Sequence, residues 1–242
     1  MLSEGGRPVA VLAALKEEAA AFLPLLEPAA AAPPLPLWRG TIERVPTVLA
    51  LTGVGKVSAA LATQFVCDRL RPACLLSIGL AGGATTGVST GQVIVASAAL
   101  QHDMDARPLT AARGVIPGLG VAEFRSDDRL SRILVAAARR VLGPGRNVVE
   151  GLVLTGDQII TSREVRDRIL AEHPRGACFD METAAIAQVA RHNSVPWAGM
   201  RITSDSADED FDLDEVIRFG AGSAAETFAK VIRAVLEDLR RE

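Results

Sequence analysis

The chain has 242 residues, of which 49% are hydrophobic and 23% are charged, so it can bury a full core, and we expect one domain over residues 1–242. Its formal net charge of -3 provides no basic surface, which argues against nucleic acid or an anionic membrane as a partner. A small, mostly neutral ligand suits this charge better.

Short apolar and β-branched runs recur after turn signals and predict buried strands. The predicted strands cover residues 9–14, 47–52, 73–79, 92–97, 149–155, 177–181 and 197–203. A further run at 37–42 is expected to pair with 47–51 as a hairpin across 43–46. The Ala/Pro-rich stretch 27–36 before it is typical of a surface connection.

Apolar residues with helical spacing predict helices between several of these strands and at the end of the chain. One set is Leu130, Ile133, Leu134, Ala137 and Val141, and the last is Phe228, Val231, Ile232, Val235 and Leu239. Alternating strands and helices predict an α/β three-layer sandwich, whose mostly parallel, mixed central sheet is flanked by helices.

The cysteines and the N-terminal segment indicate where the protein works. Cys67, Cys74 and Cys178 are odd in number, lie in apolar stretches and lack a metal-ligand spacing, which is typical of reduced core residues. The apolar run at 9–15 ends at Lys16, and no run approaches the roughly 20 apolar residues that span a bilayer. We therefore expect a cytoplasmic protein.

Ligands of parallel α/β sheets bind beyond the carboxyl ends of the strands, so polar residues that follow strands are the first candidates for a site. Five places qualify: Glu17 and Glu18, the segment 80–83, Gly156 with Asp157, Met181 with Glu182, and the segment 201–205. A buried carboxylate is costly unless it has an ionic partner or a catalytic role. Cleavage of a glycosidic bond would give Glu18, Glu182 and Asp205 such a role. That reaction needs a proton on the departing base, activation of water and a grip on the sugar.

Seven motifs along the chain occur in a distinctive order: ALKEE (14–18), TGVGKV (52–57), GLAGG (79–83), HDMD (102–105), TGD (155–157), DMETAAIA (180–187) and RITSD (201–205). In this order they resemble the 5′-methylthioadenosine/S-adenosylhomocysteine nucleosidase family, over essentially the whole chain from about Val9 to the C-terminal helix. The resemblance implies the nucleoside phosphorylase-like fold, hydrolysis of a 5′-modified adenosine, and a place in methionine salvage.

The resemblance also implies a role for each site residue. Glu18 and Arg201 would hold the attacking water, with Glu18 as its base, and Asp205 would donate a proton toward N7 of adenine. Glu182 would bind the ribose hydroxyls with Met181 against the sugar. The backbone of Ile160 would read the adenine edge, and Ser204 would lie at the substrate.

Two positions depart from the family pattern. Leu80 stands where these nucleosidases commonly have serine, which removes a hydroxyl near the ribose and the water. Ile159 stands where they often have a phenylalanine against adenine, and Phe179 would compensate by aromatic contact.

Each site residue also has a structural interpretation. Glu17 and Glu18 are expected to open a helix, where the helix dipole favours acids, and Glu182 opens the helical pattern at 183–190. Asp205 would otherwise be a helix cap or a loop acid, and Arg201 a salt-bridge partner.

Several cofactor motifs fail on single residues. Gly53 and Gly55 begin a glycine-rich turn, but Ser58 and Val57 break the dinucleotide and P-loop patterns, so a helix with Val57, Leu61 and Phe65 should follow. The acidic run 208–215 has Leu213 where a calcium loop needs glycine, so a solvated loop is expected. His102, His173 and His192 lack metal spacing, so no metal or cofactor is expected.

Three rivals remain beside the hydrolase. Phosphorolysis on the same fold would need phosphate donors near the first strand, where Glu17 and Glu18 stand instead. A non-catalytic nucleoside sensor would keep the pocket without turnover, and a dinucleotide-dependent oxidoreductase is disfavoured by the failed glycine motif. The resemblance implies a homodimer, with the loop around His102 near the interface.

Overall fold

The computed structural model describes residues 6–29, 35–84, 90–145 and 148–241 as one α/β fold around a ten-stranded sheet. The strands are β1 (Val9–Ala13), β2 (Glu27–Pro28), β3 (Leu37–Ile42), β4 (Val45–Leu51), β5 (Cys74–Gly83), β6 (Val93–Gln101), β7 (Glu123–Arg125), β8 (Val148–Thr155), β9 (Gly176–Asp180) and β10 (Trp197–Asp205). The helices are α1 (Lys56–Leu70), α2 (Asp128–Leu142), α3 (Arg163–Glu172), α4 (Thr183–His192), α5 (Leu213–Phe219) and α6 (Ala225–Arg241).

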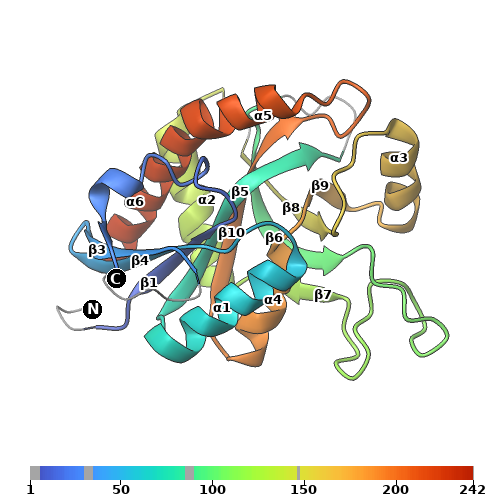
Figure 1. The fold of residues 1–242 in the computed structure, drawn as a ribbon, viewed down its shortest axis with the longest axis horizontal. Helices are drawn as coiled ribbons and strands as arrows, with labels where there is room; N and C mark the ends of the chain where they lie inside the picture. Colours follow the sequence, from blue (N-terminus) through green and yellow to red (C-terminus); the bar gives the residue numbers. More distant parts are fainter. Residues whose placement is uncertain (1–5, 30–34, 85–89, 146–147, 242) are drawn as a thin grey trace.

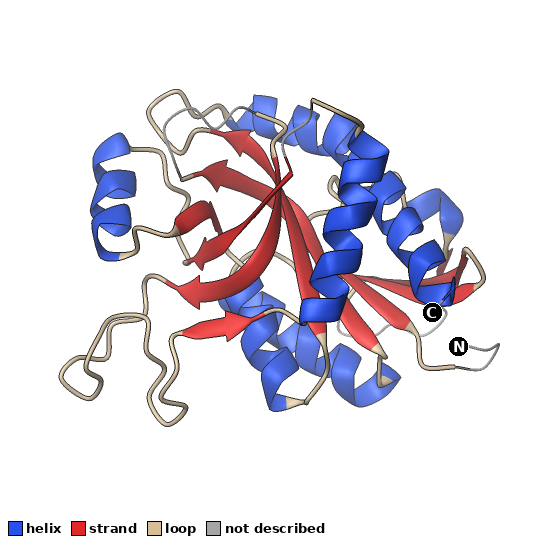
Figure 2. Ribbon diagram, turned by 180° about the vertical axis from the view of Figure 1, so that it is seen from behind, coloured by secondary structure: helices blue, strands red, loops and turns tan. Residues whose placement is uncertain are grey.

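The strand pairings close into a ring at one end of the sheet. β5 pairs with β10, β10 with β6, β6 with β8, β8 with β9, and β9 returns to β5, while β1, β4, β3 and β2 extend outward from β5. The pairings of β5 with β1 and β10, and of β8 with β6 and β9, are parallel. The two sets are joined by antiparallel pairs, β10 with β6 and β5 with β9. Because Gly82 and Gly83 pair with Phe179 and Cys178, the carboxyl ends of β5 and β9 come together, within the twisted fan of strands that Figure 2 shows.

Helices cover the sheet on both faces, which confirms the predicted three-layer α/β fold (Figure 1). The apolar stripes of α2 and α6 pack with Val9, Leu49 and Ile78 in one core. On the opposite face, small residues of α1 and α4 such as Ala59 and Ala187 pack against the strands in a second core. No helix in the described part of the chain is both long and apolar enough to cross a membrane.

The hairpin and most helices agree with the sequence predictions. β3 and β4 form the expected hairpin, but its turn is only Glu43 and Arg44, which both have positive φ. Because such two-residue turns match the strand twist, Val45 and Pro46 join β4 instead of the loop. The prediction that residues 27–36 form a surface connection was wrong at its start, where Glu27–Pro28 pairs with β3. Residues 30–34 of this stretch lie outside the described residues.

Several strands run further than predicted. β5 continues through Leu80 to Gly83, because Gly82 and Gly83 pair with β9 while Leu80 to Gly82 pair with β10. β10 continues through Arg201 to Asp205. The segment 80–83 was expected after a strand and lies within one, and β10 ends two residues beyond the predicted end at Thr203.

Two local predictions were wrong at positions that border the cavity. No helix begins at Glu17 and Glu18, where residues 16–22 form successive turns closed by bonds such as Ala19 N–H to the Lys16 carbonyl and Phe22 N–H to the Ala19 carbonyl. The acidic run 208–215 is a loop only as far as Asp212, whose side chain accepts from Glu215 N–H and caps α5.

Candidate active site

A cavity of about 300 Å³ opens at the carboxyl ends of β1, β5, β9 and β10. The predicted site residues line it with the exception of Arg201: Glu18, Leu80, Ile159, Ile160, Phe179, Met181, Glu182, Ser204 and Asp205. Three carboxylates far apart in sequence thus share one cavity. The strands bring them together because each lies at or just after the end of a strand.

Glu18 is held by backbone amides on both of its oxygens. Its Oε2 accepts from Ala14 N–H and Leu15 N–H, each at 2.9 Å, and its Oε1 accepts from Leu80 N–H at 2.8 Å. These bonds draw the side chain inward and explain why a turn, and not a helix, surrounds it. Burial raises the pKa of Glu18, while the three amides and Arg201 oppose that rise. A carboxylate with a raised pKa is a better proton acceptor near neutral pH.

Glu182 lies between the N-termini of two helices. It is the N-cap residue of α4, and its Oε1 accepts from Gly55 N–H at 2.8 Å, at the start of α1. Burial raises the pKa of Glu182, and the charge of Asp180 raises it further, against the opposing effects of Gly55 N–H and Arg201. Its side chain also borders the cavity, where a ligand can reach it.

Asp205 ends β10 and is bracketed by its own neighbours. Ser204 donates its hydroxyl to Oδ2 at 2.7 Å, and Ala207 N–H donates to Oδ1 at 2.8 Å. Burial raises the pKa of Asp205, whereas these two hydrogen bonds favour the ionised form and limit the rise. The acid form therefore persists to higher pH than in an exposed aspartate.

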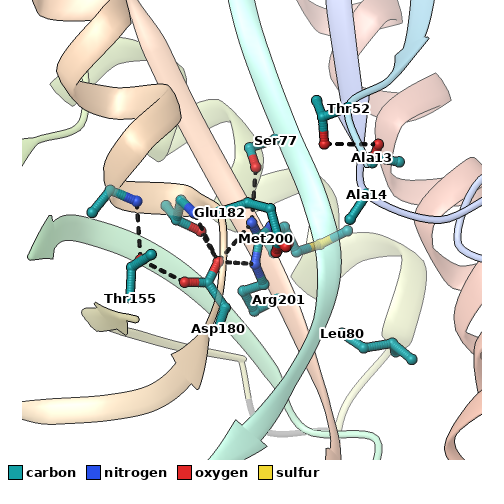
Figure 3. Close-up of polar contacts among 12 residues, drawn as sticks. Ala13, Ala14, Thr52, Ser77, Leu80, Thr155, Asp180, Glu182, Met200 and Arg201 are labelled. Atoms are coloured by element: carbon teal, nitrogen blue, oxygen red, sulfur yellow. Dashed lines mark hydrogen bonds and ion pairs between the residues drawn. The ribbon is translucent and has the colours of Figure 1, made fainter. Parts of the chain in front are cut away.

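Arg201 lies beneath the cavity, among buried partners and not on its wall. Its Nε and Nη2 each lie 2.9 Å from Asp180 Oδ2, Nη2 also donates to Ser77 Oγ at 2.9 Å, and Nη1 donates to the Met200 carbonyl (Figure 3). The predicted role of Arg201 in holding the attacking water stays a prediction. Burial lowers the pKa of Arg201, but Asp180, Glu182 and Glu18 outweigh it and keep the guanidinium charged.

Asp180 connects this arginine to the turn that carries Met181 and Glu182. Its Oδ1 accepts from Thr155 Oγ1 at 2.5 Å, and its Oδ2 accepts from Thr183 N–H at 2.9 Å (Figure 3). With a side chain 1% exposed, it forms a buried ion pair with Arg201. Removal of one partner of such a pair costs about 3–5 kcal/mol, because it leaves a buried charge uncompensated.

Strand β5 contacts both Glu18 and Asp205. Leu80 N–H donates to the Glu18 carboxylate, and the backbone of Gly82 pairs with that of Asp205, so the two contact points on β5 lie two residues apart, about 7 Å. A Cβ on Gly79 would lie 3.0 Å from Glu18 Oε1, and one on Gly82 would lie 3.2 Å from Asp205 Oδ1. Glycine at both positions lets the carboxylates approach the strand.

Apolar side chains form much of the cavity wall beside these acidic groups. Phe179 borders it and meets the His102 ring edge-to-face, with ring centroids 6.0 Å apart. Ile159 also borders the cavity but is 52% exposed, so it lies at the mouth. Leu80 extends toward Gly220, where an added Cβ would lie 3.0 Å from its Cδ1.

Sequence reasoning missed part of the site. The apolar side chains of the loop before α5 and of α5 itself close the cavity on one side: Phe211, Leu213, Val216 and Ile217. Asp180 was quoted in a motif but received no role, although a charged residue that ends an apolar strand is a signal for a buried partner. Among the residues that the structure describes, no cluster of histidine, cysteine and acidic side chains is placed to hold a metal ion.

Comparisons with known proteins agree with this geometry. A family model for the phosphorylase superfamily matches residues 8–237. The chain is 32% identical over 207 residues to the 5′-methylthioadenosine/S-adenosylhomocysteine nucleosidase of Exiguobacterium sp.. The alignment covers 84% of this chain and 85% of that protein. The chain belongs to the methylthioadenosine/S-adenosylhomocysteine nucleosidase family of the phosphorylase superfamily.

Solved nucleosidase structures share the whole architecture. The nucleosidase of Neisseria meningitidis in complex with methylthio-immucillin-A aligns with a TM-score of 0.88 and 31% identity, over 96% of this chain and 99% of that one. The enzyme of S. pneumoniae with a transition-state inhibitor aligns with a TM-score of 0.85 and 27% identity, over 96% of this chain and 99% of that one. The predicted nucleosidase family and its fold are both confirmed.

Proposed function

We propose that this chain hydrolyses the N-glycosidic bond of a 5′-modified adenosine, such as methylthioadenosine or S-adenosylhomocysteine, to adenine and the free ribose derivative. The observation that carries the proposal is the presence of Glu18, Glu182 and Asp205 on one cavity of about 300 Å³. Their surroundings differ, so the three carboxyl groups can hold different protonation states at one pH. The names of the nucleosidase relatives support the substrate class.

Each carboxyl group has one task in the proposed reaction. Protonated Asp205 donates its proton to N7 of adenine as the bond between C1′ and N9 breaks and its electron pair goes to the purine. Glu182 accepts hydrogen bonds from the ribose hydroxyls while C1′ becomes oxocarbenium-like, with Met181 against the sugar. Glu18 takes a proton from the water whose oxygen bonds to C1′. No metal or cofactor enters this scheme.

The surroundings of Glu18 favour water over phosphate. The amides of Ala14, Leu15 and Leu80 are engaged by the Glu18 carboxylate, and Arg201 is engaged by Asp180. A phosphate would need free donors at this place and would meet a negative charge instead. Phosphorolysis remains the second candidate because the superfamily includes phosphorylases.

Product analysis tests the reaction type. The protein is incubated with methylthioadenosine, with and without inorganic phosphate, and adenine and the sugar are identified by mass spectrometry. We expect adenine and free methylthioribose at the same rate in both conditions. A phosphate-dependent sugar 1-phosphate would contradict hydrolysis, and the absence of adenine would favour a sensor or another substrate.

We also propose that the protein is a homodimer that pairs through the α1–α4 face. A hollow of about 720 Å³ lies there, larger than the site cavity and bordered by Val57, Met104, Ile116 and Val189 among others. Val57 and Leu61 lie one turn apart on α1 and are 71% and 70% exposed. The loop between β6 and β7 extends beyond the body of the molecule near this face (Figure 1). Apolar side chains this exposed are typical of a surface covered by a partner.

Substitution on α1 tests the dimer. We expect the wild-type chain to sediment as a dimer and Leu61→Glu to shift it toward monomer, because a charge would be buried at the interface. Leu25→Glu is the matched control, since Leu25 is 43% exposed on another part of the surface, and its protein should remain dimeric. A monomeric wild type, or an unchanged Leu61→Glu, would refute this interface.

Three broader proposals accompany the reaction. Residues 1–242 form one domain, which is supported by a sheet that takes strands from both halves of the chain. The protein acts in the cytoplasm on a small nucleoside, with neither nucleic acid nor membrane as a partner, which is supported by its three free, buried cysteines and its net charge of -3. With methylthioadenosine as substrate, its place is methionine salvage.

A further inference from the structure

The turn that follows Asp205 has an unfavourable backbone conformation. Ala207 is fully buried and has φ of 51°, in the left-handed region that side chains with a Cβ disfavour. In this conformation its N–H reaches Asp205 Oδ1 at 2.8 Å. Such a conformation persists only when its surroundings hold it in place, and its position beside the proposed acid makes the holding group important.

Arg166 contacts this turn from another element. It lies on α3, where only it and Ile169 are buried, and its Nη1 donates to the Ser206 carbonyl at 3.1 Å. Its Nε donates to Asp167 Oδ1 at 3.0 Å, and Nη1 lies 4.0 Å from Asp208 Oδ2. The guanidinium therefore binds both sides of Ala207. Burial of an arginine side chain is costly unless its contacts compensate for the lost hydration, so these contacts hold Arg166 in place.

We infer that Arg166 is a positioning residue for the reaction: it holds the turn at Ser206 and Asp208 so that Ala207 N–H and the Asp205 carboxyl group keep their places in the cavity. The inference rests on the proposed role of Asp205 as the acid. Arg166 itself is not among the residues that line the cavity.

The charges around the turn give the inference a specific signature. Asp208 is the charged neighbour that raises the pKa of Asp205, after the larger effect of burial, and Arg166 is one of its cationic partners. Other charged groups around the turn and across the cavity are Arg163, Asp167, Glu209, Glu18, Asp180 and Glu182. Loss of Arg166 weakens both the neutralisation of Asp208 and the bond from Ala207 N–H, and both changes raise the pKa of Asp205.

The direction of the pH effect follows from the role of an acid. Asp205 must be protonated to donate, so activity is present below its pKa and is lost as pH rises through it. A higher pKa moves this alkaline limb of the kcat profile to higher pH. A variant that only lowers the folded fraction would lower kcat at every pH and leave the limb in place.

The test compares Arg166→Met, Arg166→Lys and the control Arg168→Met, which alters an exposed arginine of the same helix. We expect Arg166→Met to lower kcat for methylthioadenosine about tenfold or more with KM changed about twofold at most, through misplacement of the acid. Its alkaline limb should move upward. Arg166→Lys should recover part of kcat, and Arg168→Met should match the wild type.

Amide hydrogen exchange supplies a readout that does not depend on activity. Peptides covering residues 204–212 should exchange faster in Arg166→Met than in the wild type, while the rest of the chain is unchanged. Equal exchange in these peptides, a uniform rise over the whole chain, or wild-type kcat in Arg166→Met would each overturn the inference. If the wild-type protein releases no adenine, the proposed function fails, whereas the exchange result still decides whether Arg166 holds the turn.

Discussion

Asp205→Asn is expected to lower kcat for adenine release on the order of 100-fold or more, because an amide cannot donate the proton that the departing purine needs. The amide oxygen can still accept from Ser204 or Ala207, so the local shape should survive. KM should change much less than kcat, since the substitution removes an interaction needed in the transition state. Steady-state kinetics with methylthioadenosine measure both.

The pH dependence of kcat distinguishes loss of the proposed general acid Asp205 from a general loss of folded protein. In the wild type, kcat should fall as pH rises through the pKa of Asp205, which burial raises. The asparagine variant should lack this limb. Asp210→Asn, an exposed aspartate of the same loop, is the control and should keep wild-type kcat. Near-normal turnover by Asp205→Asn would refute the role of Asp205.

Glu18→Gln should also reduce kcat on the order of 100-fold or more, because the amide cannot take the proton of the attacking water. Its acid limb should disappear, since a base works only when ionised and the pKa of Glu18 is raised by burial. The side-chain NH₂ group of the glutamine would face a backbone N–H that now donates to the Glu18 carboxylate. Two donors would then face each other, and this unsatisfied contact would lower the free energy of unfolding by about 1–3 kcal/mol. The thermal unfolding temperature of the variant should therefore be measured together with its kcat.

Two further variants keep the result for Glu18 interpretable. Glu17→Gln alters the adjacent carboxylate, which does not border the cavity, and should leave kcat unchanged. Glu18→Asp keeps the charge on a shorter side chain and should retain more activity than the glutamine variant. A folded Glu18→Gln protein that turns over at the wild-type rate would show that another group activates water.

The fold could be predicted because its strands and helices have strong, regular patterns. The apolar stripe from Leu130 to Val141 and the run at 149–155 both correspond to elements of the structure, α2 and β8. Element ends were less accurate where tertiary contacts decide them. Gly82 and Gly83 have little preference for strands, yet pairing with β9 keeps them in β5.

The site could be predicted only as far as residue type and strand position allow. Glu18 was found because an acid follows an apolar run, but the turn around it depends on Leu80 N–H, 62 residues away. The sequence around Arg201 does not indicate its ion pair with Asp180, because hydropathy does not show which residue neutralises a buried charge. Arg166 belongs to a charged helix, and only burial in the folded chain distinguishes it from Arg163 and Arg168.

The most direct measurement is the crystal structure of the Asp205→Asn protein with methylthioadenosine bound. We predict that the nucleoside occupies the cavity with the substituted side chain at position 205 next to N7 of adenine, Glu182 at the ribose hydroxyls, and Glu18 beside a water that faces C1′. A nucleoside bound elsewhere, or oriented with its C1′ away from Glu18 and its N7 away from position 205, would contradict the account.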